Sequence, residues 1–99
     1  MGMTQQYLVG EVSLRLAQLQ AVCTDQVAAV EIRHLREEAE SAPLSGLASV
    51  VRRALRLTDG TCWETLERGD VWAFARDVDV FSQLWEFGLA AGLLTDGGC

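Results

Sequence analysis

The sequence predicts an all-α protein, a four-helix antiparallel bundle that is completed by dimerisation. Apolar residues recur at spacings of three and four along almost the whole chain, and no long segment alternates with period two. Helix caps, glycine and proline divide the chain into four such segments. Two of the segments are apolar on opposite faces. The four helices of one small chain cannot easily bury all of this apolar surface. A symmetric homodimer is the commonest closed assembly that would cover the remainder.

Length and composition limit the number of domains and the kinds of partner that we expect. The chain has 99 residues, enough for one helical domain over 1–99 with short tails at 1–4 and 95–99. Its formal net charge is −6, which disfavours binding to nucleic acid or to an anionic membrane. No apolar run approaches the roughly 18 residues of a membrane span, and no basic-then-apolar secretory leader is present. We therefore expect a cytoplasmic protein with neither nucleic-acid nor membrane partners.

The chemistry-bearing residues are few. Cys23, Cys62 and Cys99 are far apart and odd in number, which predicts reduced thiols rather than a disulfide framework or a zinc ribbon. A cysteine nucleophile would need a histidine base, and His34 is the only histidine. Every internal glycine is isolated, so no phosphate-cradling loop is present. We expect a protein that is not an enzyme and that carries no cofactor.

The first helix is expected to begin at a cap on Thr4 and to run to about residue 22. Its predicted core stripe comprises Leu8, Val12, Leu16, Leu19 and Cys23. Its second apolar stripe comprises Tyr7, Leu14, Ala17 and Ala21. Because a helix that is apolar on two sides is normally buried on two sides, the second stripe predicts contact with a partner.

The second helix is expected to begin at a cap on Thr24 or Asp25 and to end near residue 40. Pro43 sets this end, because proline lacks a backbone donor and disfavours helix in the residue before it. The predicted core stripe comprises Ala28, Ile32, Leu35 and Ala39.

The third helix is expected over residues 44–68, although Asp59-Gly60 alone would also suit a turn. One apolar stripe continues across Gly60 and favours a single helix: Leu47, Val51, Ala54, Thr58, Cys62 and Thr65. Gly69 then predicts a left-handed helix end, and Asp70 the next N-cap.

The last helix is expected over residues 71–94 and carries two stripes. A coiled-coil-like heptad seam, predicted to face the core, comprises Val71, Phe74, Val78, Phe81, Trp85, Gly88 and Gly92. A second stripe on the roughly opposite side comprises Val80, Leu84, Phe87, Ala91 and Leu94. We expect this second stripe to form part of a partner-binding surface.

The strongest candidate for a metal-binding motif is Glu31-x-x-His34 in the second helix. Glu-x-x-His is the signature of ferritin-like carboxylate metal sites, which need two such motifs and two further glutamates. Only a dimer would supply the second motif here, with Glu11 as the extra carboxylate, in a manner similar to the short encapsulated ferritins. A metal site of Glu11, Glu31 and His34 across a dimer is therefore the alternative hypothesis.

An ordinary solvated helix face also accounts for this motif. On a helical wheel His34 lies outside the core stripe, and Arg33–Glu37 and Arg36–Glu40 are spaced as weak i,i+4 ion pairs. Val27 and Val30 lie on the same side as His34, which would place it at the rim of a contact surface.

The third helix carries a second candidate surface. Arg52, Arg53 and Arg56 group on its outer face near Trp63, and arginine and tryptophan are enriched at binding hot spots. The other explanation is that these arginines pair with the chain's own acids, such as Glu67 or those ending the second helix.

Together, these patterns predict a protein–protein interaction module with a regulatory or adaptor role, acting as a homodimer. The predicted partner-binding residues are Arg52, Arg53, Arg56, Trp63, Val80, Leu84 and Phe87.

Overall fold

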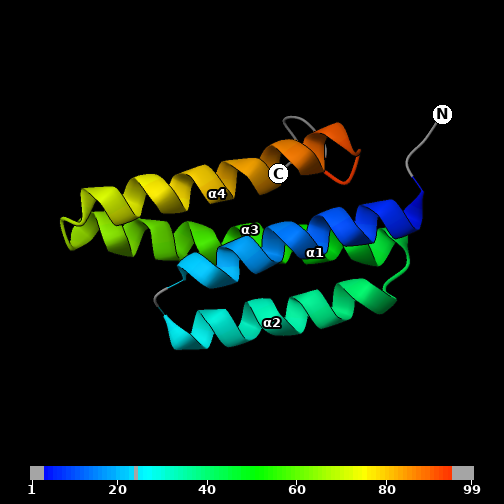
Figure 1. Ribbon diagram of the computed structural model, residues 1–99, viewed down its shortest axis with the longest axis horizontal. Coiled ribbons are helices and arrows are strands. Elements are labelled where there is room, and N and C mark those ends of the chain that lie inside the picture. The colour runs from blue at the N-terminus through cyan, green and yellow to red at the C-terminus, as the bar shows by residue number, and fades with distance from the viewer. Residues whose placement is uncertain (1–3, 24, 95–99) are drawn as a thin grey trace.

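The computed structural model describes residues 4–23 and 25–94, which form four helices and no strand. The helices are α1 Gln5–Val22, α2 Gln26–Ser41, α3 Leu44–Glu67 and α4 Val71–Ala90. Each helix packs against the next in the chain and α4 packs back on α1, with consecutive helices running in opposite directions (Figure 1). This arrangement confirms the predicted all-helical bundle. Within the described ranges, no helix is long and apolar enough to cross a membrane.

The capping residues act as the sequence predicted. Thr4, Asp25 and Asp70 each accept a hydrogen bond from a backbone N–H two or three residues further on, at 3.2, 2.9 and 3.1 Å. Each bond satisfies one of the N–H groups that a helix start leaves without a partner. Asp25 is thus the cap of α2, whereas Thr24 lies outside the described residues.

The third helix is continuous through Gly60 and ends at Gly69, whose φ is 76°. The Gly69 N–H donates to the Leu66 carbonyl at 3.0 Å, and the Asp70 N–H donates to the Thr65 carbonyl at 3.2 Å. These two bonds form a Schellman end, which satisfies carbonyls that the helix would otherwise leave unpaired. Both the unbroken helix and the left-handed glycine match the prediction.

The last helix ends at Ala90, earlier than the predicted residue 94. Gly92 adopts a φ of 77°, and the N–H groups of Leu93 and Leu94 both donate to the Gly88 carbonyl, at 2.9 and 3.0 Å. The chain therefore turns back here through a second left-handed helix end. Leu93 and Leu94 then pack against the bundle instead of extending the helix.

Gly60 within the third helix and Gly69 just after it predict opposite effects of alanine. Gly69→Ala should lower the free energy of unfolding by about 1 kcal/mol, because left-handed backbone is unfavourable for residues with a Cβ. Gly60→Ala should raise it by about 1 kcal/mol, because alanine favours helix and a Cβ there meets no atom within 4 Å. Urea unfolding followed by circular dichroism measures both, and equal effects of the two substitutions would contradict this account of the helix end.

The predicted core stripes of the first three helices are confirmed except for Cys23, which lies just after α1 and is half-buried. Their buried residues are Leu8, Val12, Leu16 and Leu19 on α1; Ala28, Ile32, Leu35 and Ala39 on α2; and Leu47, Val50, Val51, Ala54, Leu55, Thr58, Cys62 and Thr65 on α3.

The last helix faces the core with its second apolar stripe, not mainly with the heptad seam as predicted. Val80 and Leu84 of the second stripe are 9% and 0% exposed, so they belong to the core. Val71, Val78 and Trp85 of the heptad seam are 64%, 36% and 45% exposed. The expectation that the heptad seam faces the core was therefore wrong.

Contacts with two other helices explain this orientation. The guanidinium of Arg15 on α1 lies over the Phe87 ring, 4.3 Å from its centroid. On the α3 side, Gly88 lies against Val51, whose Cγ1 would be 3.4 Å from an added Cβ, an ordinary contact distance. The absence of a side chain at Gly88 matters more for Leu94 in the turn after α4, whose Cδ1 would lie only 2.6 Å from an added Cβ.

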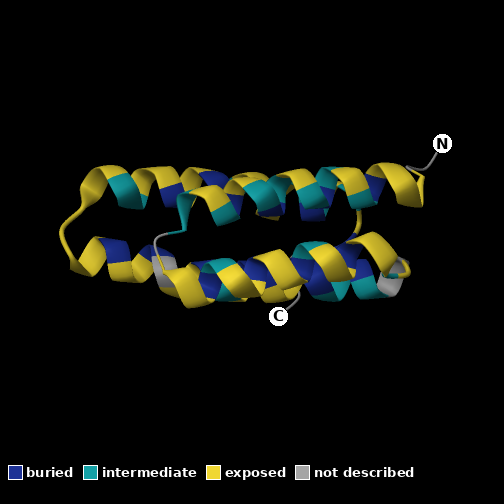
Figure 2. Cartoon of the chain, turned by 60° about the horizontal axis from the view of Figure 1, so that its bottom comes forward, coloured by how far each residue is buried: buried dark blue, intermediate teal, exposed yellow. Residues whose placement is uncertain are grey.

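The α3–α4 hairpin extends past α1 and α2 at one end of the molecule (Figure 1). At 1.5 Å per residue, the 24 residues of α3 span about 36 Å, whereas the 18 residues of α1 span about 27 Å. No other helix covers this end, and most of its residues are exposed (Figure 2). We call its exposed apolar residues, Trp63, Leu66, Val71 and Trp72, the hairpin end.

Candidate protein-interaction surface

The residues of the metal hypothesis lie apart from the core. Glu31 and His34 are exposed on α2. Glu11 on α1 accepts a hydrogen bond from Arg15 Nη1 at 2.5 Å, and this bond lowers the pKa of the Glu11 carboxyl. Residues 4–23 and 25–94 contain no group of three histidine, cysteine, aspartate or glutamate side chains that could hold a metal ion. A site assembled across two chains remains a prediction.

The ion pairs predicted along α2, Arg33–Glu37 and Arg36–Glu40, are not among the salt bridges of the described residues. Arg36 Nη1 donates to Gln20 Oε1 of α1 at 3.0 Å, so it ties α2 to α1 instead of pairing along its own helix with Glu40. Val27 and Val30 are exposed on the side of His34, as the rim hypothesis expects.

The arginine cluster of α3 divides into two parts. Arg53 forms an ion pair with Glu38 at the acidic end of α2, as the intramolecular explanation predicted. Arg52 and Arg56 are exposed and lie on the same flank of α3 as Trp63. The intermolecular hypothesis therefore keeps Arg52, Arg56 and Trp63, whereas Arg53 contributes to the bundle itself.

Three of the predicted partner-binding residues lie inside the bundle. Val80 and Leu84 are core residues, and Phe87 is half-buried beneath Arg15. The heptad seam is the more exposed stripe of α4 at Val71, Val78 and Trp85, whereas Phe74 and Phe81 are half-buried, Phe81 packs against the core and Gly88 is buried. We call the middle part of that seam, Phe74, Val78, Phe81 and Trp85, the outer seam.

The outer seam presents aromatic rings on the flank of α4 next to α3. Phe81 and Trp85 stack, with ring centroids 6.4 Å apart and 17° between the planes. Phe87 on the opposite flank faces α1, whereas Gly88, which lies beside the outer seam on the helical wheel, packs against Val51 of α3. The 3-4 spacing is the sequence signal for this surface, but spacing alone does not say which stripe faces outward.

Charged residues border the outer seam on both sides. Arg52 and Arg56 lie along α3, on the flank away from the α2 contact of Arg53. Asp79 and Glu86 are exposed on the far side of α4, beyond the outer seam. Asp59, seven residues after Arg52, is also exposed on this flank of α3, so the α3 edge carries both charges, whereas the α4 edge is acidic.

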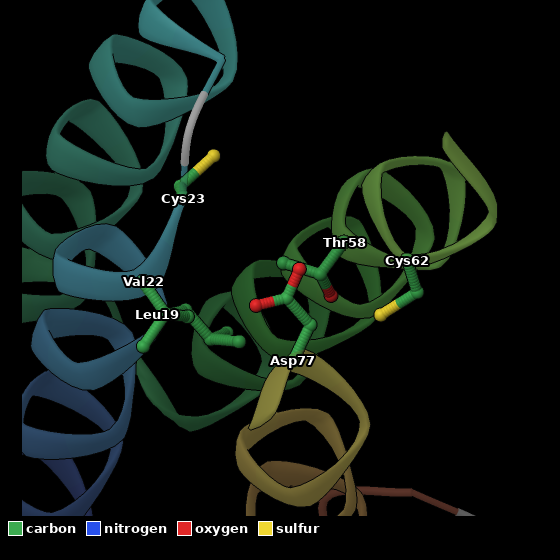
Figure 3. Close-up of a pocket in the computed structure, with 6 residues that line it drawn as sticks. All are labelled: Leu19, Val22, Cys23, Thr58, Cys62 and Asp77. Atoms are coloured by element: carbon green, nitrogen blue, oxygen red, sulfur yellow. The ribbon is translucent and has the colours of Figure 1, made fainter. Parts of the chain in front are cut away.

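A hollow at the base of the hairpin contains the two described cysteines (Figure 3). It is lined by Leu19, Val22, Cys23, Thr58, Cys62 and Asp77. Its cavity volume is about 10 Å³, about the room that one water molecule needs. Small-molecule sites are typically roughly 300–1,000 Å³. The hollow is therefore too small to favour a ligand site.

The thiols in this hollow are poor nucleophiles. Burial raises the pKa of Cys62 to about 11 and raises the pKa of Cys23 as well. Because only the thiolate reacts, the raised pKa lowers the reactivity of both thiols at neutral pH. Beside them, Arg76 Nη2 donates to the Val22 carbonyl at 3.2 Å and holds the end of α1 against α4. The hollow thus joins helices, as expected for structural cysteines.

The sequence matches no protein-family model and no curated protein, and the fold matches no solved structure. A function is therefore argued from the surface of this chain.

Proposed function

We propose that the chain is a protein–protein interaction module with a regulatory or adaptor role, and that it acts as a homodimer. One observation carries this proposal: six of the ten large exposed apolar side chains of the described residues belong to the α3–α4 hairpin. They include all three tryptophans of the chain. Contiguous exposed apolar residues of this kind mark interaction sites, and tryptophan is the residue most enriched at hot spots.

The hairpin offers two apolar regions that suit different contacts. The outer seam is a long stripe with helical periodicity, which is typical of helix–helix packing. The hairpin end projects beyond the bundle, and its Trp72 is 87% exposed. Arg56 adjoins this end beside Trp63, and arginine and tryptophan are side chains that anchor many interfaces. We assign self-association to the outer seam and recognition of another protein to the hairpin end.

The total surface supports an associating protein. The chain exposes 6149 Å². A compact monomer of this size is expected to expose about 5,500 Å². Part of the excess, roughly 600 Å², reflects the elongated hairpin, which is the region that carries the exposed tryptophans.

A pull-down from the native cell tests the recognition role. Trp63→Ala combined with Trp72→Ala should reduce recovery of the bound protein at least tenfold, because the substitutions remove both aromatic anchors of the hairpin end. The helical circular dichroism should not change, since both side chains are exposed. Glu37→Ala, at an exposed position of α2, is the control and should bind normally. Unchanged recovery with the tryptophan variant would overturn this role.

A further inference from the structure

We infer that the hairpin end binds a basic, amphipathic segment of its partner protein, one that combines arginine with apolar side chains. The inference rests on the proposed recognition role and names the chemistry of the partner. It is carried by the exposed tryptophans of the hairpin end and by the acidic side chains that lie among them.

Negative charge is concentrated at this end of the molecule. Residues 59–79 contain six acidic side chains and two arginines, a formal charge of −4 out of −6 for the whole chain. The exposed acidic residues of this segment are Asp59, Glu64, Glu67, Asp70 and Asp79. A surface of this charge attracts a cationic partner and repels nucleic acid or an anionic membrane.

The acidic residues are interleaved with the apolar residues of the hairpin end. On α3, Asp59 and Glu67 lie one turn before and one turn after Trp63, on the same face of the helix. At the start of α4, Asp70 and Val71 are neighbours in the chain. A side chain that packs on Trp63 therefore has a carboxylate within reach on either side.

The chain leaves several of these carboxylates without a cation. The salt bridges of residues 4–23 and 25–94 involve none of Asp59, Glu64 and Glu67. Glu64 and Glu67 are also spaced i,i+3 on one helix, a like-charge spacing that slightly destabilises it. A cationic side chain bound here would relieve that repulsion.

The arginines of this region leave the acidic face open. Arg76 is paired with Asp77. Arg68 follows Trp63 by five residues and so lies on a different side of α3. Arg56 is on the Trp63 flank but seven residues nearer the bundle. The acidic face therefore belongs to the projecting end of the hairpin, and positive charge begins only where the bundle begins.

Arginine suits both features of the hairpin end. A guanidinium binds a carboxylate through two parallel hydrogen bonds and also stacks on an indole ring. Trp63 and Trp72 are 56% and 87% exposed, so their rings are accessible to such a group. Apolar side chains of the same segment would pack against Leu66 and Val71, which are 40% and 64% exposed.

Two matched peptides test the inference by fluorescence anisotropy with the full chain. Both are short, labelled amphipathic helices with the same leucine face, bordered by arginine in one and by glutamate in the other. The arginine peptide should bind about tenfold more tightly than the glutamate peptide, and Trp63→Ala should weaken it by about the same factor. Asp59→Asn/Glu67→Gln should weaken it roughly threefold to tenfold, because two exposed charge contacts are lost.

Glu37→Gln/Glu40→Gln on the exposed face of α2 is the control, because it changes the net charge by the same amount. It should leave binding of the arginine peptide unchanged. Equal losses in the two double variants, or equal binding of the two peptides, would overturn the inference. Self-association of the native chain that Trp63→Ala abolishes would also overturn it, since a second copy would then be the occupant. Unaltered circular dichroism of the variants shows that any loss is one of binding.

The pull-down from the native cell separates this inference from the proposed function. If the tryptophan variant loses the bound protein but Asp59→Asn/Glu67→Gln recovers it normally, recognition at the hairpin end stands and the basic partner is wrong. If the tryptophan variant loses nothing, the recognition role itself is overturned.

Discussion

Leu84→Ala is expected to lower the free energy of unfolding by about 2–5 kcal/mol, because it removes a large side chain from a closely packed core. Leu84 is 0% exposed and lies on the α4 face that packs against both α1 and α3. The adjacent Trp85 is larger but 45% exposed. Trp85→Ala should therefore cost no more than about 1 kcal/mol, mainly the lost stacking with Phe81.

Urea unfolding of both variants at low protein concentration, where association is negligible, measures this difference. The comparison is sharp because the two positions are neighbours on one helix. If Trp85→Ala were the more destabilising substitution, the heptad seam would face the core, as the sequence alone suggested.

Val80→Asp is expected to abolish folding or to lower the free energy of unfolding by several kcal/mol, since it places an unpaired charge in an apolar core. Val80 is 9% exposed. The same change at Val78, which is 36% exposed on the outer seam, should leave the monomer folded. Val78→Asp should instead prevent dimerisation, because the charge would be buried between two subunits.

Circular dichroism and sedimentation together separate these outcomes. A folded, monomeric Val78→Asp chain beside a disordered Val80→Asp chain is the expected result. A folded Val80→Asp chain, or a Val78→Asp chain that dimerises normally, would contradict the assignment of the two faces.

Sequence patterns were sufficient to predict the core face of a helix that has one dominant apolar stripe, and the ends of a helix that has strong capping residues. In α2, the spacing of Ile32 and Leu35 leaves a single possible core face, and the structure buries it. Gly69 and Asp70 mark a junction whose left-handed backbone and capping bond only a few residue types supply. Local chemistry fixes such features before tertiary contacts form.

The orientation of α4 was not predictable in the same way. Its two stripes are similarly apolar, so periodicity gives them equal weight. Tertiary contacts decide between them, namely the Arg15–Phe87 contact and the packing that Gly88 allows. Gly92 was misjudged for a related reason, because its place on the heptad seam concealed its role as a left-handed helix end.

The candidate surface was predicted in part. Trp63, Arg52 and Arg56 are exposed as expected, whereas Arg53 pairs within the chain and Val80 lies in the core. The hairpin end was missed because its exposure follows from the difference in length between α3 and the shorter α1 and α2. Helix lengths were predicted, but which helix covers which end is a property of the assembled bundle.

The central claim is that association buries the outer seam of α4, and the fluorescence of Trp85 tests it most directly. In the variant Trp63→Phe/Trp72→Phe, Trp85 is the only remaining tryptophan. Its emission should be that of a partly hydrated indole in dilute solution and should shift to shorter wavelength as rising concentration forms the dimer. Light scattering on the same samples reports the dimer independently. An emission that stays constant across the transition from monomer to dimer would show that the outer seam is not the interface.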